Sequence, residues 1–355
     1  IDSASSVKSS FFDQKSGLSA RFSALVLFWL PPWRGRLRES VSKVLIVRPD
    51  RRVGNQIITS SLVVALAEHR PGMVVHYLAP AGKTDLVEGL PGLAKVHELP
   101  RHPWRHLGAL WRLIRTLRRE RFDVAIDASH WHSFSLTAAL FARICGAQWT
   151  IGHRRPGSVG LLDQWVPTPQ TENWPSELQT KMRLLEPLGV VVESPRMALP
   201  PMRDRDQVTR WWAEHARHPH RVVLWPTTRK TTTEIPAGMW PSVLQGLALP
   251  SDVSVAVGWG PGEEDLAEQL VRALQGQGFE AAALPSTTIA ELGAFMAEAD
   301  VVVSGDTGPL HLAGAVADQV YGIFRRPDGC RWLPPGEQHR GFVLSDQGDL
   351  EEMRR

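Results

Sequence analysis

The hydrophobic residues of this chain occur both in short continuous runs and in longer stretches with helical spacing. Continuous runs rich in β-branched residues predict buried strands at 43–49, 73–80, 123–129, 221–228, 253–260, 300–308 and 319–324. Between them, apolar residues recur every three or four positions, which predicts helices at 56–69, 103–121, 136–145, 178–188, 239–245, 263–276, 289–298 and 310–316. Strands that alternate with helices in this way are typical of an α/β fold with parallel sheets.

The predicted elements form two series of similar size, and the length of 355 residues also favours two domains. A proline-rich stretch at 194–203 predicts the linker between them. We therefore expect Rossmann-like, doubly wound domains at 43–200 and 201–330, which face a cleft formed by the loops at the carboxyl ends of their strands. The irregular segment 152–177 is expected to form loops near that cleft, and the segment 331–355 to pack back across both domains.

Residues 1–42 are expected to form an N-terminal extension. Within it, the segment 22–33 is apolar, carries tryptophan and is flanked by Arg21 and Arg34, but it is too short to span a membrane. Two interpretations remain open: the segment lies at a membrane interface, or it packs on the protein's own surface. A signal peptide is disfavoured because no cleavage site with small residues follows.

The charge composition argues against a nucleic-acid-binding protein. Lys and Arg number 40 and Asp and Glu 37, so the net charge of +3 is too small for that class. Only seven of the 40 cations are lysines. The arginine excess suits the binding of phosphate and carboxylate groups, or it reflects genome composition. Cys145 and Cys330 lie far apart and form no CxxC motif, which disfavours a metal cluster and a disulfide framework and fits a reducing compartment.

The sequence SGDTGPLHLAGA at 304–315 gives the strongest chemical signal. It predicts a buried strand that ends in a glycine-containing turn, and then a helix that Pro309 opens at a position where a missing N–H costs nothing. Free backbone amides and the helix dipole then point at one spot, which suits a phosphate or a diphosphate, and Thr307 and His311 can reach the same anion. The alternative is an ordinary helix start, with Asp306 as its cap and His311 as a half-buried histidine.

The same motif resembles the signature of family-9 glycosyltransferases, the ADP-heptose:lipopolysaccharide heptosyltransferases, which have the GT-B fold. The resemblance also covers VLIVRPDRRVGN at 44–55, the strand DVAIDAS at 123–129, PTTRK at 226–230, GWGPGEED at 258–265 and the helix at 287–300, in the family's order. It implies a GT-B fold in which the first domain binds the acceptor and the second domain binds the nucleotide sugar.

The implied reaction is an inverting, metal-independent transfer of a heptose from ADP-heptose to a lipopolysaccharide core acceptor, which is an anionic glycolipid. The resemblance implies no cofactor besides the nucleotide-sugar donor, and no metal site. It also implies a cytoplasmic enzyme, with peripheral contact to the cytoplasmic face of the inner membrane as an open possibility.

The resemblance assigns the donor site to three segments. Their residues are Asp306, Thr307, Gly308 and His311 around the diphosphate and sugar, Thr227, Thr228, Arg229 and Lys230 as a second phosphate clamp, and Gly260 with Glu263 near the ribose. The family's lysine would fall near Thr233, so Arg229 or Lys230 is expected to replace it. The alternative for Glu263 is that it stabilises the first turn of a helix through the helix dipole.

The main departure from the family lies at Gly54 and Asn55, where the family has Gly-Asp and uses the aspartate as the general base. An amide cannot take a proton at neutral pH. Asp50 and Asp127 are the carboxylates that could serve instead, and His130 or His132 could also take this role. Two further hypotheses stay open: a donor-binding protein with weak catalysis, and a protein O-glycosyltransferase that acts on a polypeptide hydroxyl.

Three charged features can each be interpreted either as functional or as ordinary structural or surface residues. Arginines on the predicted helix at 103–121 form either a solvated face or a contact with an anionic, membrane-borne acceptor. Asp204 and Asp206 imitate a metal-binding DxD motif but stand at a predicted helix start, where aspartate is a common cap. Arg325 and Arg326 either add charge near the diphosphate or are ordinary surface residues.

Overall fold

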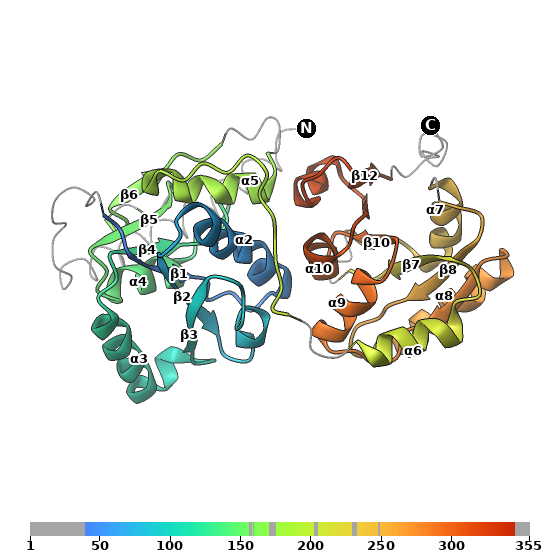
Figure 1. Ribbon diagram of the computed structural model, residues 1–355, viewed down its shortest axis with the longest axis horizontal. Helices are drawn as coiled ribbons and strands as arrows, with labels where there is room; N and C mark the ends of the chain where they lie inside the picture. The colour runs from blue at the N-terminus through green and yellow to red at the C-terminus, as the bar shows by residue number, and fades with distance from the viewer. Residues whose placement is uncertain are drawn as a thin grey trace, which may run out of the picture. The chain divides into compact units, whose positions relative to one another are not determined.

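The computed structural model describes residues 40–155, 158, 160–169, 175–201, 205–228, 233–247 and 249–344. The apolar segment at 22–33, Arg229, Lys230 and Asp204 lie outside this part of the chain. The described residues form two six-stranded sheets in which every strand pair is parallel (Figure 1). Among the described helices, none is long and apolar enough to cross a membrane.

The chain divides into two compact units, each of which contains one sheet. The first unit comprises Ile1–Arg51, Thr59–Asn173 and Gln179–Glu193, and the second comprises Arg52–Ile58, Trp174–Leu178 and Ser194–Arg355. The start of the helix after the first strand therefore belongs to the second unit. This assignment places Gly54 and Asn55 with the second sheet, although the strand before them lies in the first.

The first sheet has the order β3-β2-β1-β4-β5-β6. Its strands are β1 (Lys43–Val47), β2 (Val74–Pro80), β3 (Leu93–Leu99), β4 (Val124–Asp127), β5 (Trp149–His153) and β6 (Gln164–Val166). The helical segments are α2 (Val53–His69), η1 (Thr84–Leu86), η2 (Pro103–Arg105), α3 (Leu107–Glu120), α4 (Leu136–Ile144), α5 (Glu177–Met182) and η4 (Arg183–Leu188). Successive side chains of a strand point to opposite faces, and Leu45 and Val47 of β1 accordingly share one core with Leu117 of α3 and Phe141 of α4.

The second sheet has the order β12-β11-β10-β7-β8-β9. Its strands are β7 (His220–Trp225), β8 (Val253–Val257), β9 (Glu280–Ala283), β10 (Val301–Gly305), β11 (Val320–Phe324) and β12 (Arg340–Val343). The helical segments are α6 (Asp206–His215), η6 (Ala237–Met239), α7 (Trp240–Gly246), α8 (Glu264–Gly276), α9 (Ile289–Ala297), α10 (Gly308–Val316) and η7 (Pro327–Trp332). Figure 1 shows α9 and α10 on one side of this sheet and α7 and α8 on the other.

The two faces of β7 explain this layering. Val223 packs into the core that contains α9 and α10, whereas Val222 and Leu224 pack into the core that contains α7 and α8. A strand that is apolar at consecutive positions can be covered on both faces, which is the property of parallel sheets in α/β proteins.

Several elements differ from the sequence-based expectation. The helix expected at 56–69 begins at Val53, so that Gly54 and Asn55 lie in its first turn and not in a loop. Two strands, β5 and β6, lie in or next to the stretch expected to be irregular, and β3, β9 and β12 were not predicted. Helix α6 begins at Asp206, where a helix start was expected. In β3, only alternate positions are buried toward its end, and β9 is largely alanine, so neither contains the continuous β-branched run that marks the central strands.

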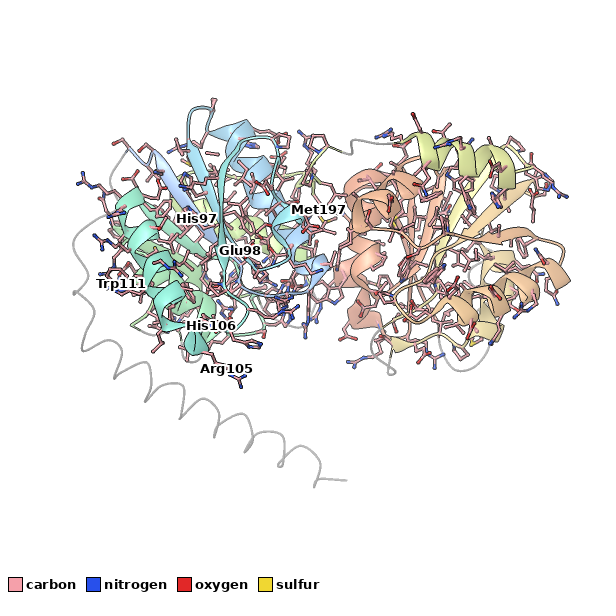
Figure 2. All side chains as sticks on the ribbon, turned by 90° about the horizontal axis from the view of Figure 1, so that it is seen from below. His97, Glu98, Arg105, His106, Trp111 and Met197 are labelled. Atoms are coloured by element: carbon pink, nitrogen blue, oxygen red, sulfur yellow. The ribbon has the colours of Figure 1, made fainter. Side chains whose placement is uncertain are left out.

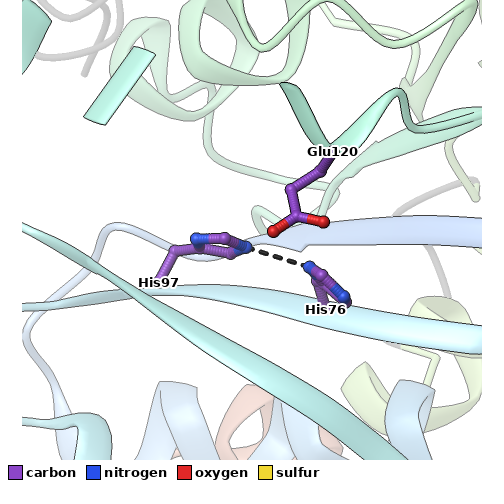
Figure 3. A group of neighbouring side chains, drawn as sticks. All are labelled: His76, His97 and Glu120. Carbon is purple, nitrogen blue, oxygen red and sulfur yellow. Dashed lines mark hydrogen bonds between the residues drawn. The ribbon is translucent and has the colours of Figure 1, made fainter. Parts of the chain in front are cut away.

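A polar cluster joins β1, β2, β3 and α3. Figure 3 shows three of its side chains, His76, His97 and Glu120. His76 Nδ1 lies 2.9 Å from His97 Nε2, and both rings are buried. The Glu120 carboxylate accepts hydrogen bonds from Lys43 (2.5 Å) and Lys95 (2.8 Å), which lower the pKa of Glu120 to about 2. The ligand atoms of His76, His97 and Glu120 lie within 4.8 Å of one another, a spacing that could hold a metal ion. Both Glu120 oxygens are, however, already bound to ammonium groups, so we assign the cluster to holding α3 on the sheet.

This cluster should make the protein less stable in acid. Burial, together with His76 and Lys95, lowers the pKa of His97 to about 4, and burial lowers the pKa of His76. Between pH 6.5 and 4 the unfolded chain therefore binds more protons than the folded chain, so the free energy of unfolding falls as the pH drops through this window. In His97→Gln, which keeps a hydrogen-bonding group without titrating, urea unfolding should depend less on pH across the window. An equal dependence in both proteins would contradict this assignment.

Candidate functional site

The second unit brings three loops together at the carboxyl ends of neighbouring strands. The sheet order β10-β7-β8 places the ends of these strands side by side, and the chain leaves β7 toward β8 and later returns to the other side of β7 with β10. Such a reversal of strand order is where parallel α/β sheets bind ligands. All the predicted donor-site residues that the structure describes follow these three strands.

The turn after β10 leads directly into the amino terminus of α10. Thr307 is the residue before the first turn, with extended backbone (φ −149°, ψ 172°), and its side chain makes no capping hydrogen bond to the helix. The expected alternative, with Asp306 as the cap, is therefore not what the structure shows. Pro309 stands in the first turn, and the Thr307 hydroxyl is not used to cap it. This helix start can offer backbone N–H groups and its positive dipole end to an anion.

The first turn of α2 lies against the first turn of α10. A Cβ atom added to Gly54 would lie 2.5 Å from Cδ2 of His311 and 3.3 Å from Cα of Gly308. A Cβ added to Gly308 would in turn lie 3.6 Å from the backbone nitrogen of Gly54. Glycine is therefore required at position 54 by packing, and two helix amino termini come close to each other at this point.

His311 occupies the buried side of this contact. The residue is 7% exposed, and its ring packs edge-on against Trp332 at 5.8 Å between centroids. Burial lowers the pKa of His311 to about 4, and the Glu177 carboxylate raises it by a smaller amount. The imidazole is therefore neutral at pH 7 and presents one donor and one acceptor nitrogen.

Glu263 ties the loop after β8 to the loop after β7. Its Oε2 accepts hydrogen bonds from the Thr227 hydroxyl at 2.7 Å and from the Gly260 backbone N–H at 2.9 Å. The residue precedes α8 without capping it through its side chain. Since the Thr227 proton is donated to Glu263, the geometry favours Thr227 as a support for this carboxylate over direct donation to a phosphate.

Thr228 lies where β7 and β10 approach closely. A Cβ added to Gly305 would lie 3.0 Å from Cγ2 of Thr228, and the Thr233 hydroxyl donates to the Thr228 hydroxyl at 3.4 Å. A pocket of about 80 Å³ opens beside this contact. It is lined by Thr233, Asp306, Phe324, Arg325, Arg326, Asp328, Gly329, Arg331 and Trp332.

Two residues that were not predicted from the sequence, Arg331 and Trp332, line this pocket. Both belong to η7, which follows β11, and Trp332 contacts His311 as well as lining the pocket. Arg326, one of the two arginines with an open interpretation, pairs with Asp328 at 3.0 Å. The position of η7 directly after the last predicted strand was the available signal, because loops after neighbouring parallel strands converge.

In the first unit, Asp127 is locked into the structure. The residue is fully buried, and its Oδ2 forms an ion pair with Arg155 Nη2 at 3.0 Å. Its Oδ1 accepts hydrogen bonds from the backbone N–H and hydroxyl of Ser129 at 3.0 and 2.5 Å. These contacts favour a structural role for Asp127 over the abstraction of a substrate proton.

His130 is also held by an arginine. Arg48 donates to the Ala128 carbonyl at 2.6 Å and lies 2.7 Å from His130 Nε2. A guanidinium can only donate, so Nε2 of His130 accepts and its lone pair is occupied. His132 is exposed and stacks on His130 at 5.2 Å, and Asp50 is half-buried in the loop after β1.

A second pocket lies at the carboxyl edge of the first sheet. Its volume is about 200 Å³, and its lining includes Pro49, Pro80 and Leu99 from the ends of β1, β2 and β3. Arg51 and Arg101 supply positive charge, and Pro103, at the start of η2, also lines the pocket. Asn55 belongs to the second unit, whereas Asp50, Asp127, His130 and this pocket belong to the first.

The sequence profile of glycosyltransferase family 9 (heptosyltransferase) matches residues 110–355. Lipopolysaccharide heptosyltransferase 3 of Escherichia coli is 22% identical over 317 residues, which cover 84% of this chain and 91% of that protein.

Solved structures share the fold at low sequence identity. A family 9 glycosyl transferase from Veillonella parvula superposes with a TM-score of 0.67 and 15% identity over 86% of both chains. The ADP-heptose lipopolysaccharide heptosyltransferase II of E. coli superposes with a TM-score of 0.62 and 17% identity, over 86% of this chain and 91% of that chain. E. coli heptosyltransferase WaaC, solved with ADP-2-deoxy-2-fluoro heptose, superposes with a TM-score of 0.61 and 18% identity, over 84% of this chain and 92% of that chain. The expected GT-B class of α/β fold is confirmed.

The contact between α2 and α10 can be tested by stability. Gly54→Ala places a methyl group 2.5 Å from the His311 ring, so the ring or the helix must move. Overpacking of this kind costs about 1–3 kcal/mol, and we expect a loss in that range in urea unfolding. Gly108→Ala is the matched control, because a Cβ there meets nothing within 4 Å and glycine inside a helix is itself unfavourable. A Gly54→Ala protein as stable as the parent would contradict the close approach.

Proposed function

The chain belongs to glycosyltransferase family 9, and from this premise we propose that it transfers a heptose from ADP-heptose to a lipopolysaccharide core acceptor. The observation that carries the proposal is the start of α10, where the backbone amides after Thr307 and the neutral His311 lie beside the first turn of α2. The heptosyltransferases that match in sequence and in fold, one of them solved with an ADP-heptose analogue, support this choice of donor and acceptor.

The donor diphosphate would bind at the amino terminus of α10. Backbone N–H groups at a helix start and the dipole of the helix bind phosphate without a charged side chain. Thr307 would add a hydroxyl and His311 a neutral hydrogen-bonding group. Arg229 and Lys230, which follow β7 in the sequence, would supply the cationic part of the clamp. The sugar would lie toward the pocket beside Asp306.

The ribose of the donor would bind to Glu263. Its Oε2 is occupied by Thr227 and Gly260, and in the described part of the chain no group hydrogen-bonds to Oε1. Oε1 can therefore accept from ribose hydroxyls, with the carboxylate already oriented by two donors. This role explains why a glycine-rich turn precedes Glu263, since Gly260 must approach it closely.

The reaction would be an inverting displacement at the anomeric carbon of the heptose. The acceptor oxygen forms the new glycosidic bond while the bond to the diphosphate breaks, through an oxocarbenium-like transition state. Negative charge then develops on the leaving diphosphate, and preorganised amides, Thr307, Arg229 and Lys230 would stabilise it. These groups supply the positive charge that a metal ion would otherwise provide, so we expect transfer to be independent of metal.

The acceptor hydroxyl must lose a proton, and we assign its removal to Asp50. Asn55 cannot act as a base, Asp127 is bound by Arg155 and Ser129, and His130 accepts from Arg48. The remaining candidate histidine, His132, is exposed and stacks on His130. Asp50 is the half-buried carboxylate after β1, next to Arg51, which lines the 200 Å³ pocket. That pocket, with Arg51 and Arg101, suits an acceptor sugar that carries phosphate or carboxylate groups.

Donor binding can be measured without turnover. ADP and ADP-sugars should raise the melting temperature, because a ligand at 100 times its Kd adds about 2.7 kcal/mol to the free energy of unfolding. Glu263→Gln and His311→Ala should each lower the affinity for ADP at least tenfold, as measured by a thermal-shift titration.

Glu264→Gln is the matched control for the donor site, since Glu264 is an exposed carboxylate of the same helix start. It should bind ADP as the parent does. Equal losses in Glu263→Gln and Glu264→Gln would indicate the helix-dipole role for both residues. A shift with UDP or GDP sugars and none with ADP would overturn the assignment of ADP-heptose.

The base assignment predicts different outcomes at positions 50 and 55. Asp50→Asn should lower transfer by about 100-fold or more and leave the ADP thermal shift unchanged, because general-base catalysis contributes about 10²–10⁴-fold. Asn55→Asp should bring no large gain. Asp85→Asn, at the start of η1, serves as the control. A large gain in Asn55→Asp would instead show that the chain has lost its base at this position.

A further inference from the structure

The outer face of α3 exposes two large apolar side chains that the fold does not bury. Leu107 is 66% exposed and Trp111 is 59% exposed. They are four residues apart and therefore lie on the same side of the helix. Figure 2 shows Trp111 on the outer side of α3. Among the described residues, the other exposed large hydrophobic side chains are Val74, Trp165 and Val191, which lie singly on other segments.

The same face is strongly basic. Its exposed arginines, with those of the two flanking turns, are Arg105, Arg112, Arg115, Arg118, Arg119 and Arg121. None of these arginines forms an ion pair with the residues that the structure describes. The single acidic residue of α3, Glu120, faces the sheet and is bound by Lys43 and Lys95. The outer face therefore has a large positive charge with no carboxylate of its own helix to balance it.

The inner face of α3 is firmly attached to the sheet. Leu110 and Leu117 are buried in the core shared with β1 and α4, and Glu120 holds the end of the helix through two lysines. The helix thus keeps its outer side chains in fixed positions. Arg115 stacks over Trp111 at 5.1 Å from its ring centroid, which leaves the indole exposed beside a guanidinium.

We propose that the outer face of α3 docks on an anionic phospholipid bilayer. Leu107 and Trp111 would enter the boundary between headgroups and acyl chains, where indole rings are favoured. The arginines would bind lipid phosphates in bidentate fashion, with their stems lying along the apolar surface. Each arginine near an anionic membrane is worth about fivefold in affinity. A nucleic acid would use the arginines, but it gives no reason for an exposed leucine beside them.

The position of α3 connects this surface with the proposed acceptor pocket, and this step rests on the proposed function. Pro103 of η2 lines the 200 Å³ pocket, and α3 begins at Leu107, directly after η2. A membrane contact through Leu107 would therefore hold the pocket, with Arg51 and Arg101, near the headgroup region. The sugars of a membrane-anchored glycolipid lie at that level.

The test is co-sedimentation of the full chain with vesicles of phosphatidylglycerol and phosphatidylcholine, compared with phosphatidylcholine alone. We expect binding that requires phosphatidylglycerol and weakens with salt. The double variant Leu107→Ser, Trp111→Ser and the triple variant Arg112→Gln, Arg115→Gln, Arg119→Gln should each lower the partition coefficient at least tenfold. All variants retain residues 1–39, so any contribution of that segment stays constant.

The matched control is Trp165→Ser with Val191→Ser, which removes an exposed tryptophan that lies under Arg154 at 5.4 Å and an exposed valine from the same unit. It should bind vesicles within twofold of the parent. Parent-like binding by both α3 variants would overturn the proposal. Loss of binding in the arginine variant alone would also overturn it, because the surface would then be a site for a polyanion and not for a bilayer.

The ADP thermal shift, measured on the same variants, separates this proposal from the proposed function. The α3 side chains lie outside the donor site, so the shift should be unchanged in all of them. Vesicle binding that depends on α3, together with no response to ADP, would retain the membrane contact and reject the donor assignment. A normal ADP response without vesicle binding would do the reverse.

Discussion

The proposed donor site depends on one close approach, between Gly54 and the first turn of α10. With no side chain at position 54, the start of α2 lies against Gly308 and the ring of His311, and Trp332 packs against that ring as well. Enclosed in this way, the imidazole is neutral down to about pH 4. Positive potential at the site comes from the two helix starts instead of an ionisable group, so the binding of the proposed anion would depend little on pH across the physiological range.

The same logic applies to the other polar groups of the molecule. Glu263 is oriented by Thr227 from one loop and Gly260 from another, and Asp127 is oriented by Arg155 and Ser129. In each case the carboxylate is fixed by donors from separate segments. The difference lies in exposure: Glu263 keeps one oxygen available at the carboxyl edge of the sheet, whereas Asp127 is fully buried with both oxygens bound. Glu263 is therefore placed to bind the proposed ligand, whereas Asp127 is bound within the fold.

The central strands and the turn at 304–308 are predictable because their signal is local. A continuous β-branched run marks a strand buried on both faces, and the order of glycine, aspartate, threonine and proline after it marks a helix start. The pairings Thr227–Glu263 and Asp127–Arg155 join residues 36 and 28 positions apart. They depend on the order of strands in the sheet, which cannot be predicted from a local sequence pattern. The position of Asn55 inside a helix was not predicted for a different reason. Glycine and asparagine on their own favour turns, but here the packing of Gly54 against α10 outweighs that preference.

The many arginines of this chain fall into a buried group and an exposed group, and the composition alone cannot tell the two apart. Arg48 and Arg155 are buried, and the planar guanidinium of each donates to several partners at once. Arg155 binds Asp127 and the carbonyls of His130 and Ser133. Arg48 binds the carbonyl of Ala128 and the ring of His130. A lysine, with one compact charge, could not span these positions. The arginines of α3 are exposed and form no ion pair among the described residues; Arg118 donates to the Ile144 carbonyl at 3.0 Å, and Arg115 stacks over Trp111. Leu110, Leu117 and Glu120 anchor this helix without these arginines. The positive charge on its outer face, beside Leu107 and Trp111, is therefore available for the proposed bilayer contact.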